Sequence, residues 1–228
     1  MLELIMVDHP LSLEDRAALY RALGDQRRLR IVDALQHGDR SFGSLAELTG
    51  MSTSLLAFHL DVLEDVGVLR RIVSQGDARR RYVTLEPDLL TVLGEPPPLD
   101  RSADQVLFVC TANSARSQLA AHLWQERTGC PALSAGTEPA SEIHPTAITT
   151  AHRHGLDLTA ARPRDYHDLD VRPDLVVTVC DRAHERGPDL GAPSLHWSVP
   201  DPVGGGADAF EAAYERLSLR VDRLVRAA

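Results

Sequence analysis

The sequence predicts two domains, a mainly α-helical domain that ends in a β-hairpin and then a three-layer α/β domain with an open parallel sheet. Leu-rich segments with helical spacing fill the first part, whereas short apolar runs alternate with helical segments in the second. Three consecutive prolines, Pro96–Pro98, separate the two patterns, and prolines neither continue a helix nor pair inside a sheet. We therefore expect a first domain at residues 1–93, a linker at 94–103 and a second domain at 104–228.

The composition is that of a folded protein without a membrane-spanning segment. Of the 228 residues, 43% are hydrophobic and 25% are charged, which excludes a wholly disordered or fibrous chain. No apolar run approaches the ~18 residues that cross a bilayer. The first ten residues carry acids and a proline instead of the features of a signal peptide. Because three cysteines are too few for a disulfide framework, we expect a cytoplasmic protein with reduced thiols and no membrane association.

Serine residues precede three of the four helices expected in the first domain. In that position a serine side chain can accept a hydrogen bond from an N–H group of the first helical turn. The last of these helices carries Leu56, Leu60 and Leu63 at i, i+4 and i+7, so these leucines are expected to form its buried stripe. The four helices are expected at residues 12–23, 26–36, 41–50 and 52–66.

A basic β-hairpin follows the helices. Two short β-runs, Leu69–Ser74 and Arg81–Leu85, are joined by a loop that carries Arg79 and Arg80. The net charge of the chain is −9, so any binding to nucleic acid depends on a local basic patch such as this one. Two short helices joined by a tight turn at Gly50 and followed by a basic hairpin are typical of a winged helix-turn-helix domain.

Residues 23–31 and 42–66 resemble the ArsR/SmtB family of metalloid-responsive repressors. The resemblance implies a transcriptional regulator that binds operator DNA and forms a homodimer through this domain. It places the start of the fourth helix in the major groove and the arginines of the hairpin against phosphate or the minor groove. The alternative is that these arginines are only a solvated hairpin tip. The expected DNA-contacting residues are Ser52, Thr53, Ser54, Ala57, Phe58, His59, Arg79, Arg80 and Arg81.

Two features of the first domain depart from that family. Residues 1–109 contain no cysteine, so the thiolate pair that binds arsenite or soft metals in many members is missing. The chain also has no His/Cys cluster with zinc spacing, and no metal site is expected. The outward face of the fourth helix carries Phe58, Asp61 and Asp65, where a helix that contacts DNA favours arginine or polar groups. We therefore expect modest affinity for DNA, or a domain that serves dimerisation.

In the second domain a buried strand runs directly into a loop suited to an oxyanion. The apolar run Gln105–Val109 is followed by Cys110, and a helix with regular apolar spacing follows Arg116. Strand, loop and helix aim backbone N–H groups and a helix N-terminus at an anion. The five residues between Cys110 and Arg116 suffice to curl around one tetrahedral oxyanion, while the guanidinium clamps two of its oxygens. The expected oxyanion-binding residues are Thr111, Ala112, Asn113, Ser114, Ala115, Arg116 and Ser117.

Residues 106–124 resemble the low-molecular-weight tyrosine phosphatase superfamily, and specifically its arsenate reductase branch; the resemblance covers nearly all of 104–228. It implies that Cys110 is the nucleophile for bound arsenate or phosphate, held as a thiolate by the positive loop. It also implies that Asp201 protonates the leaving oxygen. Cys180 ends one later β-run and Asp201 follows another, so parallel strands are expected to bring both to the edge where Cys110 lies.

Cys180 separates the two activities found in this superfamily. A reductase needs a second thiol that attacks Cys110 and releases arsenite as a disulfide forms, whereas a phosphatase does not. Thioredoxin-coupled reductases carry a further cysteine at the position of Gly187, so we expect an external thiol reductant (thioredoxin, mycothiol or glutathione) and no bound cofactor. The preferred interpretation is an arsenate reductase fused to a DNA-binding regulator. The alternatives are a phosphomonoesterase and a non-enzymatic repressor that senses oxyanions or oxidation.

Overall fold

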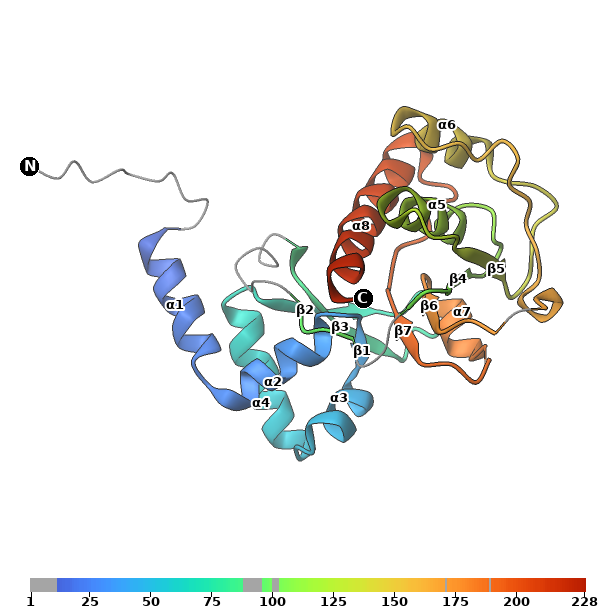
Figure 1. Ribbon diagram of the computed structural model, residues 1–228. Helices are drawn as coiled ribbons and strands as arrows, with labels where there is room; N and C mark the ends of the chain where they lie inside the picture. Colours follow the sequence, from blue (N-terminus) through green and yellow to red (C-terminus); the bar gives the residue numbers. More distant parts are fainter. Residues whose placement is uncertain (1–11, 88–95, 100–102, 171, 189) are drawn as a thin grey trace, which may run out of the picture.

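The computed structural model describes residues 12–87, 96–99, 103–170, 172–188 and 190–228. Two domains lie in direct contact along one side of each (Figure 1). Half of the expected linker, residues 94, 95 and 100–102, falls outside the described residues. At its described end, the Leu99 N–H donates a hydrogen bond to the Ala227 carbonyl over 2.7 Å, so this end of the proline segment rests on the second domain. The domain boundary at 94–103 stays a prediction.

The first domain is a winged helix-turn-helix, as the sequence predicts. Its elements are α1 (Leu13–Leu23), α2 (Gln26–Leu35), β1 (Arg40–Ser41), α3 (Phe42–Thr49), α4 (Thr53–Asp65), β2 (Leu69–Val73) and β3 (Arg81–Leu85). Ser12, Ser41 and Ser52 each accept a backbone hydrogen bond from the first turn of the next helix, which confirms the predicted starts. Leu56 and Leu60 are fully buried, as part of the expected stripe. The small sheet has the antiparallel order β1-β3-β2.

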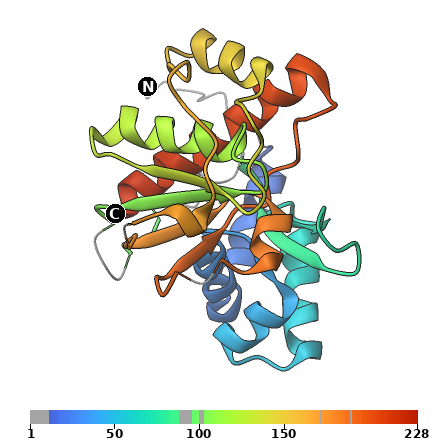
Figure 2. The same ribbon diagram turned by 90° about the vertical axis from the view of Figure 1, so that its right-hand side faces the viewer.

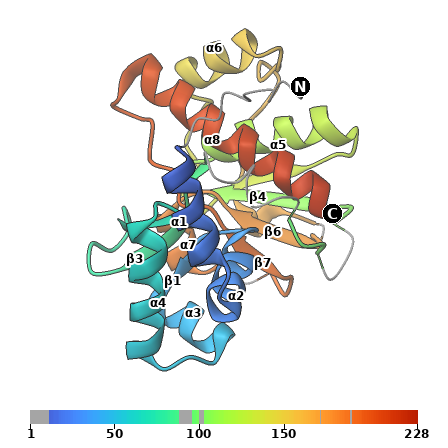
Figure 3. The ribbon, with the colours of Figure 1, turned by 90° about the vertical axis from the view of Figure 1, so that its left-hand side faces the viewer.

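The second domain is the predicted α/β fold with a parallel sheet. Its elements are β4 (Val106–Cys110), α5 (Arg116–Thr128), β5 (Leu133–Gly136), α6 (Pro145–Arg153), η2 (Tyr166–Asp168), β6 (Leu175–Thr178), α7 (Asp181–Arg186), β7 (Ser194–His196) and α8 (Gly206–Ala227). The strand order is β5-β4-β6-β7. Helices α5, α6 and α8 lie on one side of the sheet and α7 lies on the other (Figures 2 and 3). The first domain lies next to β7 and contacts both α8 and α7. No helix within the described ranges is long and apolar enough to span a membrane.

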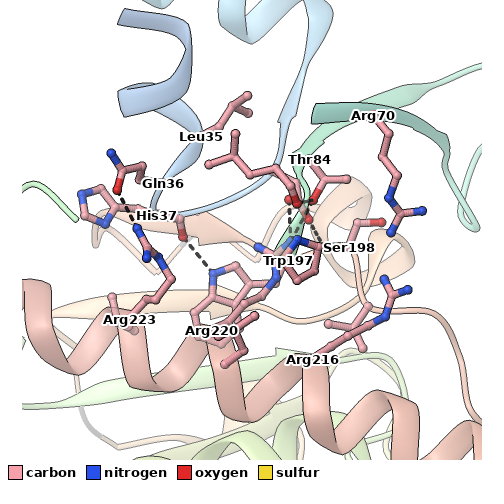
Figure 4. A pocket seen from close by; sticks show the side chains of 16 residues that line it. Leu35, Gln36, His37, Arg70, Thr84, Trp197, Ser198, Arg216, Arg220 and Arg223 are labelled. Atoms are coloured by element: carbon pink, nitrogen blue, oxygen red, sulfur yellow. Dashed lines mark hydrogen bonds and ion pairs between the residues drawn. The ribbon is translucent and has the colours of Figure 1, made fainter. Parts of the chain in front are cut away.

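Buried polar contacts join the two domains. Asp39, in the loop before β1, is almost completely buried, and its carboxylate accepts hydrogen bonds from the Ser198 N–H (2.6 Å) and from Arg220 Nη2 (2.7 Å). The Trp197 indole Nε1–H donates to the His37 carbonyl over 2.8 Å (Figure 4). A buried carboxylate is stable only when its oxygens are hydrogen-bonded or paired, so this interface is a specific contact between the domains.

The backbones of the two domains lie close together at Gly38. A Cβ atom at this position would lie 2.6 Å from the carbonyl oxygen of His196, so only glycine fits without a shift of the backbone. Nearby, Arg223 Nη2 donates to Gln36 Oε1 over 2.6 Å. A small cavity of about 40 Å³ remains between α8 and the first domain, and Trp197 is among its lining residues (Figure 4).

Candidate active site

The expected reactive residues meet at one edge of the parallel sheet. Cys110 is the last residue of β4, Cys180 follows β6, and Asp201 follows β7. Parallel strands end at the same edge of a sheet, and ligands bind there. The end of β5, the neighbouring strand, lies close to the loop. A Cβ atom at Gly136, the last residue of β5, would lie only 2.6 Å from the Thr111 carbonyl oxygen.

Cys110 lies at the bottom of a tightly hydrogen-bonded loop. Its side chain is 2% exposed, its Sγ accepts a hydrogen bond from the Asn113 N–H over 3.2 Å, and it lies 3.0 Å from Ser117 Oγ. Both neighbours can donate a hydrogen bond to the sulfur. Asn113 has φ 49°, a left-handed conformation that non-glycine residues rarely adopt, so the surrounding contacts must hold the loop in shape.

Gln118 and Arg164, which the sequence analysis did not single out for these roles, hold Asn113 in place, and the Arg162 carbonyl in turn contacts Gln118. Gln118 Nε2 donates to Asn113 Oδ1 over 3.1 Å, and the backbone N–H of Arg164 donates to the same oxygen over 2.9 Å. Gln118 Nε2 also lies 3.2 Å from the Arg162 carbonyl. The segment around Arg164 is distant in the sequence, so no local pattern could have indicated that it supports the loop.

Arg116 is the first residue of α5 and is held by the segment before Asp201. Its side chain is almost completely buried; Nη1 donates to the Val199 carbonyl over 2.9 Å, and Nη2 lies 3.1 Å from Asp201 Oδ2. The guanidinium therefore links the loop after β4 to the loop after β7. An incoming oxyanion would compete with the Asp201 carboxylate for this cation.

Above the loop lies an open pocket of about 470 Å³. The charged and thiol side chains that line it come from the segments that follow β4, β6 and β7 in the second domain. The first domain contributes one glutamine, Gln75. Cys110 is not among its lining residues and lies beneath it. The pocket is lined by Gln75, Thr111, Arg116, Cys180, Asp181, Arg182, Asp201 and Val203.

Cys180 differs from Cys110 in its surroundings. It is buried, and its Sγ lies 3.4 Å from Thr111 Oγ1. Burial raises the pKa of the Cys180 thiol, and negative charge on Cys110 raises this pKa further, while Arg116 acts to lower it. Cys180 is therefore a thiol at neutral pH. Cys110, Cys130 and Cys180 are all free, and Cys130 lies exposed after α5.

Gln75, between β2 and β3 of the first domain, reaches this site. Its Oε1 accepts a hydrogen bond from the Asp201 N–H over 2.8 Å, and its own N–H donates to Asp181 Oδ2 over 2.7 Å. Asp181 Oδ1 lies 3.1 Å from His196 Nε2. Burial acts to raise the pKa of Asp181, but the hydrogen bonds from His196 and from the Gln75 N–H outweigh it and keep this pKa below its usual value. The sequence analysis missed Gln75, because it is more than a hundred residues away along the chain.

Two stacked imidazole rings, those of His184 and His196, lie next to Asp181. The rings of His184 and His196 stack with centroids 4.1 Å apart, and Tyr82 of the hairpin packs against both. Burial lowers the pKa of His184 to about 4, and the neighbouring His196 acts in the same direction. His184 is therefore neutral at physiological pH and serves packing between the domains. Within the described parts of the chain, no cluster of three or more His, Cys, Asp or Glu side chains is placed to hold a metal ion.

The expected DNA-contacting residues lie on two surfaces of the first domain. Ser52, Thr53 and Ser54 are exposed at the start of α4, and Phe58 is 58% exposed on the same helix. His59 differs, because it is only 3% exposed, and a direct contact between His59 and DNA does not fit this placement. Its position follows Phe58 by one residue, which turns it toward the leucine stripe of α4.

The arginines of the hairpin face solvent. The Arg79 side chain is 91% exposed, with Nε 3.1 Å from Asp77 Oδ1, and Arg80 Nε lies 3.7 Å from Asp77 Oδ2. Arg81 is also exposed. Asp77 therefore offsets part of the positive charge of this tip.

A family model described as low molecular weight phosphotyrosine protein phosphatase matches residues 105–228. The chain belongs to this family. A second model, described as bacterial regulatory protein, arsR family, matches residues 25–71 within the winged helix-turn-helix domain. Together the two matches confirm the fusion that the sequence analysis predicts.

Similar proteins include both reductases and phosphatases. Arsenate reductase 1 of Bacillus cereus (strain ATCC 10987 / NRS 248) is 32% identical over 124 residues, which cover 52% of this chain and 91% of that protein. A solved structure titled "An arsenate reductase in the phosphate binding state" is 25% identical and covers 53% of this chain and 95% of that one, with a TM-score of 0.49. A tyrosine phosphatase of Erwinia amylovora is 24% identical and covers 55% of this chain and 93% of that one, with a TM-score of 0.47.

In this phosphatase-family domain, the residues predicted for catalysis occupy one site. Thr111, Arg116, Cys180 and Asp201 line the pocket, and Cys110 lies below it. Of the remaining expected loop residues, Asn113 and Ser117 contact the Cys110 sulfur and each other, while the carbonyls of Ala112, Ser114 and Ala115 accept backbone N–H groups from Ala140, His144 and Leu119. The four residues predicted for catalysis supply two thiols, one cation and one carboxylate, and Asp181 and Arg182 add a second carboxylate and a second cation to the pocket. This set suits transfer of an oxyanion to a thiol followed by attack of the second thiol.

Proposed function

We propose that the C-terminal domain reduces arsenate to arsenite with thiols as electron donors, and that the N-terminal domain is a cytoplasmic regulator that binds operator DNA. The observation that carries the proposal is the presence of a second thiol, Cys180, at the pocket above Cys110. A module that only bound an anion would need neither Cys180 nor the carboxylate of Asp201. The 32% identity to an arsenate reductase supports arsenate as the substrate.

In the first step the Cys110 thiolate attacks arsenic and forms a sulfur–arsenic bond. One arsenic–oxygen bond breaks, and the oxygen leaves as water after it receives a proton from Asp201. Arg116 exchanges its ion pair with Asp201 for two oxygens of the substrate, which frees the Asp201 carboxyl group to hold the proton. The backbone N–H groups of the loop bind the other oxygens.

In the second step Cys180 attacks the sulfur of Cys110. A disulfide forms, the sulfur–arsenic bond breaks, and its electron pair stays on arsenic, which changes from As(V) to As(III) and leaves as arsenite. Across both steps, two thiols and arsenate give a disulfide, arsenite and water. An external thiol (thioredoxin, glutathione or mycothiol) then reduces the disulfide and completes the cycle.

Hydrolysis of phosphate esters is the second candidate, because Cys110, Arg116 and Asp201 would serve it equally. The described residues that line the pocket include no aromatic side chain. A pocket without aromatic walls is poorly suited to an aryl phosphate. This activity would not use Cys180, which gives a direct way to separate the two reactions.

The test is arsenite release from arsenate with each of the three reductants. We expect turnover by the wild type, none by Cys110→Ser, and loss of at least about a hundredfold with Cys180→Ser, because the second thiol is required to release arsenite. Cys130→Ser is the matched control, since Cys130 is exposed and outside the pocket, and it should keep the wild-type rate.

Other outcomes would favour the alternatives. If p-nitrophenyl phosphate is hydrolysed at a rate that Cys180→Ser leaves unchanged, and arsenate is not reduced, the domain is a phosphatase. If neither substrate is turned over and operator binding changes on oxidation, the chain is a redox-sensing repressor.

The proposal for the first domain rests on its exposed surfaces. The start of α4 and the hairpin arginines face solvent, where a major groove and phosphates could meet them. Helix α1 exposes Leu13 and Tyr20 and projects from the molecule (Figure 1). Exposed apolar side chains on one helix favour contact with another chain, and we propose a homodimer formed through this domain.

A further inference from the structure

The loop that joins β2 and β3 is fixed against α7 of the phosphatase-family domain. Ser74 Oγ donates a hydrogen bond to Glu185 Oε1 over 2.6 Å, and the Tyr82 hydroxyl donates to the same oxygen over 3.2 Å. The Gln75 N–H donates to Asp181, as described above, and Arg182 Nε lies 3.4 Å from the Gln75 carbonyl. The backbone of Gln75 is thus held from both sides by the catalytic domain.

Glycine allows this approach at the next residue. A Cβ at Gly76 would collide with the carboxylate of Glu185 and lie 3.2 Å from the backbone nitrogen of Arg182. The hairpin tip therefore rests directly on the helix that begins after Cys180. The contact positions the side chain of Gln75 at the pocket.

The Gln75 side chain contacts the loop that carries the proposed acid. Asp201 has a half-exposed side chain, and two groups outside its own loop hold it: Gln75 Oε1 accepts its N–H, and Arg116 pairs with its carboxylate. During the proposed reaction Arg116 binds the substrate instead of Asp201. Of the two groups, only Gln75 then still contacts Asp201. A general acid works only when it stays within hydrogen-bond reach of the leaving oxygen.

We propose that Gln75 is a positioning residue for the catalytic acid Asp201, so that the DNA-binding domain supplies part of the active site. The inference rests on the proposed reaction and adds a residue from the other domain to it. A purely structural Gln75 would serve only the docking of the hairpin. Docking, however, depends on Ser74, Tyr82 and the Gln75 backbone, which substitutions of the Gln75 side chain leave in place.

Two substitutions separate these roles. Gln75→Met keeps the length of the side chain but removes the acceptor for the Asp201 N–H. Gln75→Glu keeps an acceptor and adds a negative charge beside an anion site. Ala78→Met is the matched control, because it places the same methionine at an exposed position on the same hairpin.

We expect Gln75→Met to lower kcat for arsenate about tenfold, a part of the 10²–10⁴ that a general acid supplies, and to leave KM nearly unchanged. Gln75→Glu should retain kcat within about threefold and raise KM, because the added charge repels the oxyanion. Amide hydrogen exchange at Asp201, measured by NMR, should accelerate in Gln75→Met but not in Gln75→Glu or Ala78→Met.

The inference is overturned if the Asp201 amide exchanges equally in wild type and Gln75→Met, or if exchange accelerates while kcat stays unchanged. A wild-type protein that turns over arsenate normally in the same assay shows that only the role of Gln75 has failed. If the wild type does not turn over arsenate, both the proposed function and the catalytic role of Gln75 are wrong. Amide exchange at Asp201 still decides whether the hydrogen bond between Gln75 and the Asp201 N–H exists.

Discussion

At the scale of single residues, the two pocket cysteines differ in ways that separate their roles. The sulfur of Cys110 receives the Asn113 N–H and lies beside the Ser117 hydroxyl, whereas Cys180 lies beside the Thr111 hydroxyl, and the Ala183 N–H also acts to lower its pKa. Because burial and the neighbouring Cys110 raise the pKa of Cys180, Cys180 holds its proton in the proposed reaction while Cys110 attacks. Attack by Cys180 then requires loss of that proton, which orders the two steps.

The step that forms the disulfide should therefore accelerate as the pH rises. Below the raised pKa of Cys180, the thiolate fraction grows about tenfold per pH unit, and the rate should follow it. Single-turnover arsenite release at pH 6 to about 9, with quenching by an alkylating agent, measures this step. Thr111→Val removes the hydroxyl that lowers the pKa of Cys180, so it should shift the profile to higher pH. A rate independent of pH would contradict the assignment of Cys180.

At the scale of elements, the β2–β3 hairpin carries two surfaces. Its loop start, at Ser74 and Gln75, rests on α7, while Arg79 and the next two arginines face solvent. Hydrogen bonds inside the tip make it rigid, because Ser74 Oγ accepts from the N–H groups of Gly76 (2.9 Å) and Asp77 (3.1 Å). A rigid tip allows one element to contact the catalytic pocket and present positive charge at the same time.

Replacing the three arginines at 79–81 with alanine should weaken binding to all DNA sequences and reduce the slope of log K against log salt by about one per lost phosphate contact. Fluorescence anisotropy at several salt concentrations measures both quantities. Arg153→Ala, which removes a charge from α6 far from the hairpin (Figure 1), is the control and should change neither. Unchanged affinity in the triple variant would mean that the tip is only a solvated surface.

At the scale of the whole molecule, the domain interface connects the two proposed functions. Asp39 and Trp197 join the domains near α8, and Gln75 joins them at the pocket. A ligand that moves the loop of Asp201 must act on the hairpin through Gln75. Since such coupling is reciprocal, occupation of the pocket and binding of the hairpin to DNA are expected to influence each other.

Asp39→Ala should loosen this interface. It removes the acceptor of the Ser198 N–H and leaves Arg220 without its ion pair, at an expected cost of about 2 kcal/mol in unfolding free energy, because Arg220 is partly exposed. Urea unfolding followed by tryptophan fluorescence measures this cost, since Trp197 lies at the interface. Asp33→Ala, on the exposed side of α2, should cost under about 0.5 kcal/mol. Equal midpoints for both variants would show that the contact contributes nothing to stability.

Patterns within short segments were sufficient to predict both domains. Capping serines marked the helix starts, the leucine spacing marked the buried face of α4, and an apolar run before Cys110 marked the central strand. These features depend on hydrogen bonds and burial within a few residues, so the sequence carries them locally. The same local reading placed His59 with the exposed residues of α4, although the helix turns it into the core.

The position of the domains relative to each other could be learned only from the folded molecule. The contacts of Asp39 with Ser198, of Gln75 with Asp201 and of Arg164 with Asn113 join residues that are far apart along the chain. Each depends on where whole elements pack, and no spacing or composition encodes that arrangement. The candidate reactive residues of the pocket could thus be predicted from the sequence, whereas the contribution of the β2–β3 hairpin to that pocket arises from packing between elements distant in sequence.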